Sequence, residues 1–260
     1  NAAAMLHVLR YSDSWVLSFL YIGTFGSFIG YSFAFGQVLQ INFLATPGTT
    51  AAAAALHAAQ IAFLGPLLGS LSRPLGGLLA DRIGGAKITM WCFVAMALAA
   101  GVVVAAGTRN DGQPGKISTG IMVAYVAGFI VLFIISGIGN GSVYKMIPVA
   151  FAKRSLHLDG FSSVQAAHWA RSMSGALIGI AGAVGALGGV FINVVLRASY
   201  AGADKSATMA FWVFLAFYLV CLAVTWIAYV RQPSAGQRPR LASRATDGAA
   251  TEAADLPRYQ

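Results

Sequence analysis

The stretch FLGPLLGSLSRPLGGLLADRIGGAK, residues 63–87, is a long apolar segment that ends in a charged turn. Residues 63–80 contain a single charged side chain, that of Arg73, and the next charges come only at Asp81 and Arg82. Because about 20 mostly apolar residues cross a hydrocarbon core as a helix, we predict that this segment spans a membrane and that the charged turn lies at its surface. An arginine inside such a span is energetically costly, so Arg73 is the first candidate for a functional residue.

The composition of the whole chain indicates a membrane protein. Of 260 residues, 58% are hydrophobic and 10% are charged, and the mean hydropathy is +0.72, which is too apolar for an ordinary soluble domain. Six apolar stretches of sufficient length are separated by short polar segments. They lie at 14–44, 53–80, 86–107, 118–150, 170–197 and 207–230. The predicted fold is therefore an all-α integral membrane bundle of six transmembrane helices within residues 1–231.

The net charge of +9 follows the expected topology. Placing both ends of the segment in the cytoplasm puts eleven of the 17 lysines and arginines on that side and four on the other, with Arg73 and Lys145 inside spans. This asymmetry obeys the positive-inside rule, so the basic character indicates orientation and not a nucleic-acid partner. Residues 232–260 are rich in Pro, Ala, Ser, Gly and Arg without an apolar period, which predicts a disordered cytoplasmic tail.

The charged turn between the second and third spans carries a recognisable motif. Gly77, Asp81, Arg82, Gly84 and Lys87 fall at the spacing of the cytoplasmic loop motif of the major facilitator superfamily, and the sequence resembles that superfamily here. Six spans with this loop match one half of its twelve-span fold. The resemblance implies that the first four of these residues act as a conformational latch. Glycine suits a tight turn because it adopts positive φ at little cost, and the charged side chains can pair with each other or with neighbouring segments.

Several intramembrane stretches make the resemblance more specific. Residues 21–37, 63–77, 136–148 and 174–191 resemble the C-terminal half of the nitrate/nitrite porter family, and GIAGAVGALGGVF at 179–191 corresponds to its glycine-rich nitrate signature. The resemblance implies a carrier for nitrate and nitrite in a bacterial inner membrane, surrounded by lipid. Because the chain opens with Asn and has no second block of six spans, we expect an N-terminal six-helix half elsewhere in the same chain or in a separate one.

Arg73 has a physical role that agrees with this resemblance. The family pattern places Arg73, Tyr21 and Phe25 around the anion, and the second arginine of that pattern has no counterpart in this chain. A guanidinium can offer two parallel hydrogen bonds to a flat trigonal anion. Phe25 would provide an apolar wall and Tyr21 a hydroxyl donor. The alternative interpretation is that Arg73 extends its long stem to the cytoplasmic headgroups.

Small and polar residues in the fourth and fifth spans allow two interpretations each. The glycine stripe consists of Gly175, Gly179, Gly182, Gly185 and Gly189. It allows close helix packing, or it also narrows the pathway, in which case Gly182 and Gly185 contact the substrate. Asn140 and Ser142 either hydrogen-bond between helices or bind substrate. We expect Lys145 to extend to the cytoplasmic headgroups.

Other function classes find no support in the sequence. No nucleophile, base, cofactor loop or metal spacing indicates an enzyme or a metal site, and no cofactor is expected. All eight acidic residues lie in loops, tails or span ends, which favours nitrate/nitrite exchange over proton coupling because a proton-coupled pathway usually holds a titratable group. Two alternatives remain open: a carrier for another small anion or organic acid, and a membrane half that does not transport.

Overall fold

The computed structural model describes residues 2–111, 117–158, 160–202 and 205–231. Asn1–Val230 form one compact unit. The described ranges contain helices and no strands, which confirms the all-α class. The tail predicted at 232–260 lies outside the described residues.

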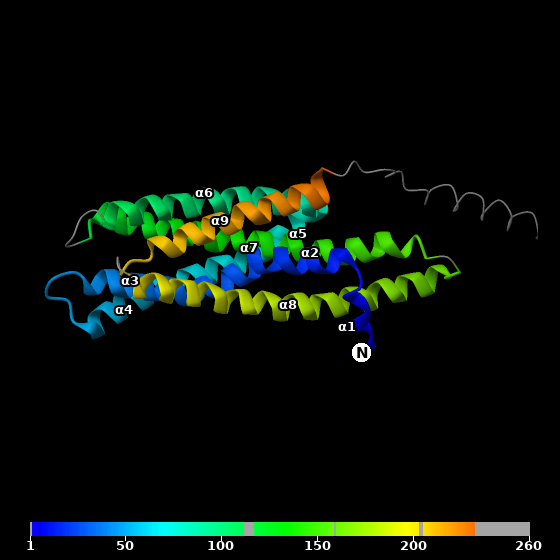
Figure 1. Ribbon diagram of the computed structural model, residues 1–260, viewed down its shortest axis with the longest axis horizontal. Helices are drawn as coiled ribbons and strands as arrows, with labels where there is room; N and C mark the ends of the chain where they lie inside the picture. Colours follow the sequence, from blue (N-terminus) through cyan, green and yellow to red (C-terminus); the bar gives the residue numbers. More distant parts are fainter. Residues whose placement is uncertain (1, 112–116, 159, 203–204, 232–260) are drawn as a thin grey trace, which may run out of the picture. The chain divides into compact units, whose positions relative to one another are not determined.

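Six apolar helical segments of the compact unit are long enough to cross a membrane, as predicted. A short helix, α1 (Ala2–Val8), precedes them (Figure 1). The crossings consist of α2 (Ser12–Tyr21), η1 (Ile22–Gly26) and α3 (Ser27–Leu44); α4 (Ala51–Ala62) and α5 (Leu64–Ile83); α6 (Gly85–Asp111); α7 (Thr119–Ser155); α8 (Ser163–Ala201); and α9 (Thr208–Thr225) with η2 (Trp226–Val230). Consecutive crossings run in opposite directions. One end of the bundle therefore carries the start of α2, the α5–α6 and α7–α8 connections and the end of η2.

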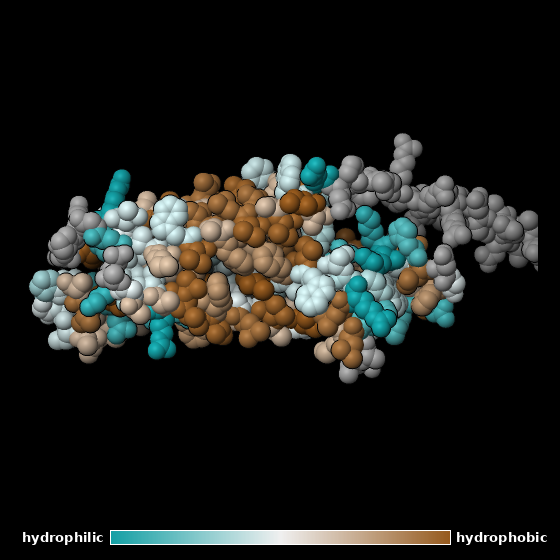
Figure 2. Space-filling model, viewed as in Figure 1, coloured by the Kyte–Doolittle hydropathy of each residue, from teal (hydrophilic) through white to brown (hydrophobic). Residues whose placement is uncertain are grey.

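The surface of the compact unit has the pattern of a membrane protein. Figure 2 shows hydrophobic residues gathered over the middle of the helices and hydrophilic residues toward both helix ends. Helices α7 and α8 have 37 and 39 residues, which at about 1.5 Å per residue exceeds a hydrocarbon core about 30 Å thick. Both helices must therefore tilt or extend beyond the hydrocarbon.

Two crossings are irregular in ways that the hydropathy pattern did not predict. The second crossing is interrupted at Phe63, between α4 and α5. Pro66 lies three residues later and has no N–H to donate to the carbonyl of Ala62, which explains why the α-helical ladder is broken there. The first crossing contains a π-helical segment, η1, whose wider turn is of a kind often found at functional sites.

Helices α5 and α7 approach each other closely through glycines. A Cβ at Gly76 would lie 1.9 Å from the carbonyl oxygen of Ile138, and a Cβ at Gly137 would lie 2.1 Å from that of Gly69. Ser72 adds a side-chain hydrogen bond of 2.9 Å to the carbonyl of Ile134 on α7. Only residues without a side chain allow backbones this close, so these glycines set how α5 sits on α7.

Candidate functional site

The backbone of Arg73 lies against α7, and its side chain lies near the first crossing. A Cβ at Gly141 of α7 would lie 2.1 Å from the Arg73 carbonyl oxygen and 3.0 Å from the Gly77 nitrogen. This half of the α5 circumference is therefore in contact with α7, and the Arg73 side chain projects toward span one instead. Its guanidinium carbon lies 4.2 Å from the ring centre of Phe28 and 5.4 Å from that of Phe25. The rings provide cation–π attraction but no hydrogen-bond acceptor.

The Arg73 guanidinium is only partly compensated within the bundle. The Arg73 Nε atom is buried and has no hydrogen-bond partner. In the described part of the chain the two ion pairs are Lys145–Asp81 and Arg154–Asp13, so Arg73 is not neutralised by any of those carboxylates. Its position over the rings of Phe28 and Phe25, which belong to the first crossing, goes against the snorkelling interpretation. A desolvated cation without a carboxylate partner is a strong attractor for an external anion.

The π-helical turn aligns two of the predicted site residues. In η1 the wider turn brings side chains four residues apart more nearly into line than an α-helix would. The rings of Tyr21 and Phe25 are stacked, with centres 5.1 Å apart and an interplanar angle of 29°. A Cβ at Gly185 of α8 would lie 3.0 Å from an atom of each ring. The structure thus brings Arg73, Phe25, Tyr21 and Gly185 into one cluster.

The glycine stripe of α8 is divided between two environments. Gly185 lies against η1, and Gly188 and Gly189 approach Gly26 and Ile29 of span one. In contrast, a Cβ at Gly182 would meet nothing within 4 Å, so Gly182 faces open space on the described part of the bundle. Close packing therefore explains the later glycines of the stripe but does not explain Gly182.

Asn140 and Ser142 have different surroundings on α7. Asn140 is buried at 3% exposure and directly precedes Gly141, whose Cα lies against the Arg73 backbone. Ser142 is fully buried, and its hydroxyl donates to the Gly85 carbonyl at 2.8 Å and lies 2.9 Å from the Thr89 hydroxyl. The Ser142 hydroxyl therefore joins α7 to α6 and is not brought together with Arg73.

The predicted latch lies at the α5–α6 connection. Gly84 alone separates the two helices and has φ +102°, a conformation that favours glycine. Asp81 pairs with Lys145 of α7 at 2.8 Å, with the two side chains about half exposed. Lys145, which we expected to extend toward the cytoplasmic headgroups, thus reaches the carboxylate at the end of α5. Gly77 faces the Lys145 stem, where a Cβ would make an ordinary 3.6 Å contact; Arg82 is exposed.

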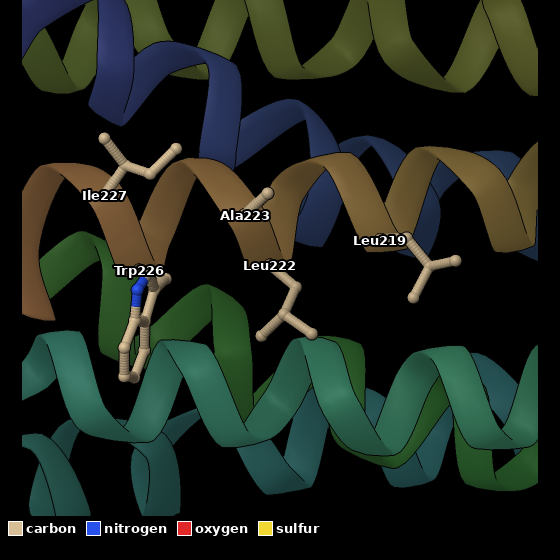
Figure 3. A pocket seen from close by; sticks show the side chains of 5 residues that line it. All are labelled: Leu219, Leu222, Ala223, Trp226 and Ile227. Atoms are coloured by element: carbon tan, nitrogen blue, oxygen red, sulfur yellow. The ribbon is translucent and has the colours of Figure 1, made fainter. Parts of the chain in front are cut away.

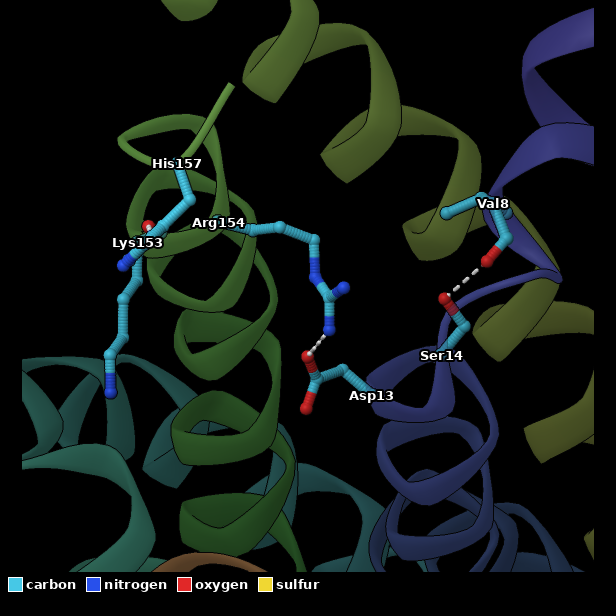
Figure 4. A network of polar contacts seen from close by, with 6 residues as sticks. All are labelled: Val8, Asp13, Ser14, Lys153, Arg154 and His157. Atoms are coloured by element: carbon cyan, nitrogen blue, oxygen red, sulfur yellow. Dashed lines mark hydrogen bonds and ion pairs between the residues drawn. The ribbon is translucent and has the colours of Figure 1, made fainter. Parts of the chain in front are cut away.

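A second ion pair joins α2 and α7 at the same end of the bundle. Arg154 in the last turn of α7 donates to the Asp13 carboxylate in the first turn of α2 at 3.0 Å (Figure 4). Its guanidinium also lies 4.6 Å from the ring centre of Tyr11. Figure 4 also shows the Ser14 hydroxyl directed at the Val8 carbonyl, a 2.6 Å hydrogen bond that holds α1 to α2. These contacts organise the helix ends and lie apart from the Arg73 cluster.

A shallow surface groove on the last crossing is unsuited to an anion. Its lining is apolar apart from the indole N–H and lies on α9 and η2, with Leu222 and Trp226 directed toward α6 (Figure 3). The lining residues are Leu219, Leu222, Ala223, Trp226 and Ile227. A groove of this composition suits lipid chains, so the Arg73 cluster remains the candidate site.

Sequence reasoning missed two parts of the site. Phe28, whose ring is nearest to the Arg73 guanidinium, shares a helical face with Tyr21 and Phe25, and that spacing was the signal that could have identified it. The close approach of Gly26 to Gly188, where a Cβ at Gly26 would lie 3.0 Å from the Gly188 Cα, depends on pairing two distant glycines. No local pattern encodes that pairing.

Comparisons with known proteins find nitrate/nitrite transporters among the relatives of this chain. The nitrate/nitrite transporter NarU of Salmonella typhimurium is 35% identical over 235 residues, covering 89% of this chain and 47% of the relative. NarU of Escherichia coli is 34% identical over the same shares. The "Probable nitrate/nitrite antiporter NarK2" of Thermus thermophilus is 30% identical over 89% of this chain and 45% of its own length. A scan of known protein families finds none that matches. The chain spans about half the length of the curated relatives it matches.

Proposed function

We propose that this chain, a multi-pass membrane protein similar over most of its length to about half of the nitrate/nitrite transporters of the major facilitator superfamily, is one half of a secondary carrier for nitrate and nitrite. The carrier works by alternating access between two six-helix halves, with the anion bound between them. It lies in a bacterial inner membrane with both ends of this segment in the cytoplasm, as the distribution of basic residues favours.

The observation that carries the proposal is the environment of Arg73. Its guanidinium lies over Phe28 and Phe25, and its Nε is buried without a partner. Nitrate is flat and trigonal, so two of its oxygens can accept parallel N–H bonds from the guanidinium, while an aromatic face can cover the plane of the anion. Bound nitrate would remove the cost of the uncompensated charge.

Exchange is the favoured mode of transport. In the described residues the acidic side chains are Asp13, Asp81 and Asp111, all within three residues of a helix end. The described interior of the bundle therefore holds no carboxylate that could carry a proton alongside the anion. An uncompensated arginine resists reorientation of the empty carrier, so return of the carrier requires a second anion. The Thermus thermophilus relative is named a probable nitrate/nitrite antiporter, which is in line with this mode.

The experiment is a counterflow assay on the full-length carrier in proteoliposomes. Vesicles are preloaded with labelled nitrite, and its exit is measured with and without external nitrate. We expect nitrate to accelerate exit, and formate and acetate to have no effect. Acceleration by formate or acetate but not nitrate would favour an organic-acid carrier instead, and no response to any anion would leave a half that does not transport.

A pH-sensitive dye trapped in the same vesicles tests the mode. Exchange predicts nitrate entry without acidification of the lumen. Acidification that scales with nitrate uptake would replace exchange with proton symport, and the coupling group would then lie outside the described residues.

A further inference from the structure

Three buried hydroxyl groups, those of Ser27, Tyr31 and Tyr218, are hydrogen-bonded in a row, and Ser27 directly follows the π-helical turn. Tyr218 of α9 donates to the Ser27 hydroxyl at 2.9 Å, and the Tyr31 hydroxyl is also hydrogen-bonded to that of Tyr218. Each of the three residues is only 1% exposed. Ser27 is the first residue of α3 and directly precedes Phe28, whose ring lies over the Arg73 guanidinium.

This polar contact is unusual among the contacts of the π-helical turn. Gly23 and Gly26 allow η1 to pack closely, with Cβ positions 2.8 Å from the Cys221 sulfur and 2.9 Å from the Gly185 carbonyl. Thr24 donates within span one, to the Leu20 carbonyl at 3.3 Å. We compared the side-chain hydrogen bonds of residues 21–27, which are η1 and the residue on each side of it. Among the described residues, the Tyr218–Ser27 bond is the one that joins this segment to another helix.

A π-helical turn needs such a contact because its position in a helix is easily shifted. Moving the turn by one position toward α3 would rotate the residue that it passes, Ser27, by about 100° about the helix axis, since an α-helix has 3.6 residues per turn. A Ser27 hydroxyl rotated away from Tyr218 would be buried without a partner, which is costly in an apolar interior.

We propose that Tyr218 is a positioning residue for the anion site: by hydrogen-bonding Ser27 it selects the rotation of α3 that places Phe25 and Phe28 against Arg73. The proposal rests on the proposed function, because its effect is read through the nitrate site. A rotation of only about 20° would move a ring about 6 Å from the helix axis by about 2 Å. Misplacements of that size in a binding site lower its efficiency strongly.

The test uses Tyr218→Phe and Ser27→Ala in the full-length carrier, singly and together, in the counterflow assay. Either change removes one hydroxyl and keeps the neighbouring packing. We expect the KM for nitrate to rise about 3- to 15-fold in each single variant, as the measured range for hydrogen bonds between membrane helices suggests. The double variant should rise no further than the larger single, because both changes break the same bond.

Tyr125→Phe is the matched control. Tyr125 is a buried tyrosine, 3% exposed, on α7, away from η1, and we expect its KM to be that of the wild type. If the Tyr218→Phe carrier fails to assemble in the membrane, Ser27→Ala tests the same hydrogen bond from its other side.

A merely structural role gives a different result. It would lower the melting temperature and the maximal rate of both variants while leaving KM unchanged, and that outcome would overturn the proposal. Additive KM effects of the two changes would also overturn it. If the wild type itself shows no nitrate-dependent exit of nitrite, the proposed function fails and the positioning role fails with it; normal wild-type exchange with unchanged KM in the variants refutes the positioning role alone.

Discussion

Replacing Arg73 with lysine tests whether a planar guanidinium, and not merely a positive charge, binds the anion. Lysine keeps the charge, so insertion of the span should not change. Its compact ammonium cannot offer two parallel N–H bonds in one plane. The loss of one hydrogen bond between charged groups costs about 2 kcal/mol, and the loss of stacking on Phe28, now at 4.2 Å, adds about 0.5–1 kcal/mol.

Together these losses amount to about 2.5–3 kcal/mol, which corresponds to about 70- to 150-fold weaker binding of nitrate. The assay is nitrate/nitrite counterflow over a range of nitrate concentrations, with carrier in the membrane quantified by immunoblot. Arg109→Lys is the control, because Arg109 is an exposed residue in the last turn of α6. A near-normal KM and maximal rate for Arg73→Lys would refute the anion-binding role and return Arg73 to the snorkelling interpretation.

Two further predictions concern packing and the latch. Gly141→Ala should reduce the amount of monodisperse carrier in detergent, because its Cβ would lie 2.1 Å from the Arg73 carbonyl and the two backbones would have to separate; Gly101→Ala, where a Cβ meets nothing within 4 Å, should not. Asp81→Asn should change the melting temperature little, because its pair with Lys145 is about half exposed and such pairs contribute about 0–1 kcal/mol. It should nevertheless change the maximal exchange rate at saturating nitrate, and an unchanged rate would remove Asp81 from the latch.

The class of fold followed directly from the sequence. Hydrophobic spans are encoded locally, because each crossing must be apolar over about 20 residues whatever its neighbours are. Arg73 was identified by the same local logic, since a charge within residues 63–80 is an exception that needs a reason. Family resemblance implied that Arg73, Tyr21 and Phe25 surround an anion; in the structure the three side chains lie close together, and their role as an anion site stays a proposal.

The remaining features depend on contacts between segments distant in sequence. The meeting of Gly141 with the Arg73 backbone and the pairing of Asp81 with Lys145 each join residues that no helical period relates. Hydropathy cannot predict them, because in lipid the helices associate through close packing and a few polar contacts and not through burial of apolar surface. The sequence alone therefore determined which segments cross the membrane and which charge is exceptional. The tertiary structure decided that this charge lies over the rings of Phe28 and Phe25, with no carboxylate of the described residues paired to it.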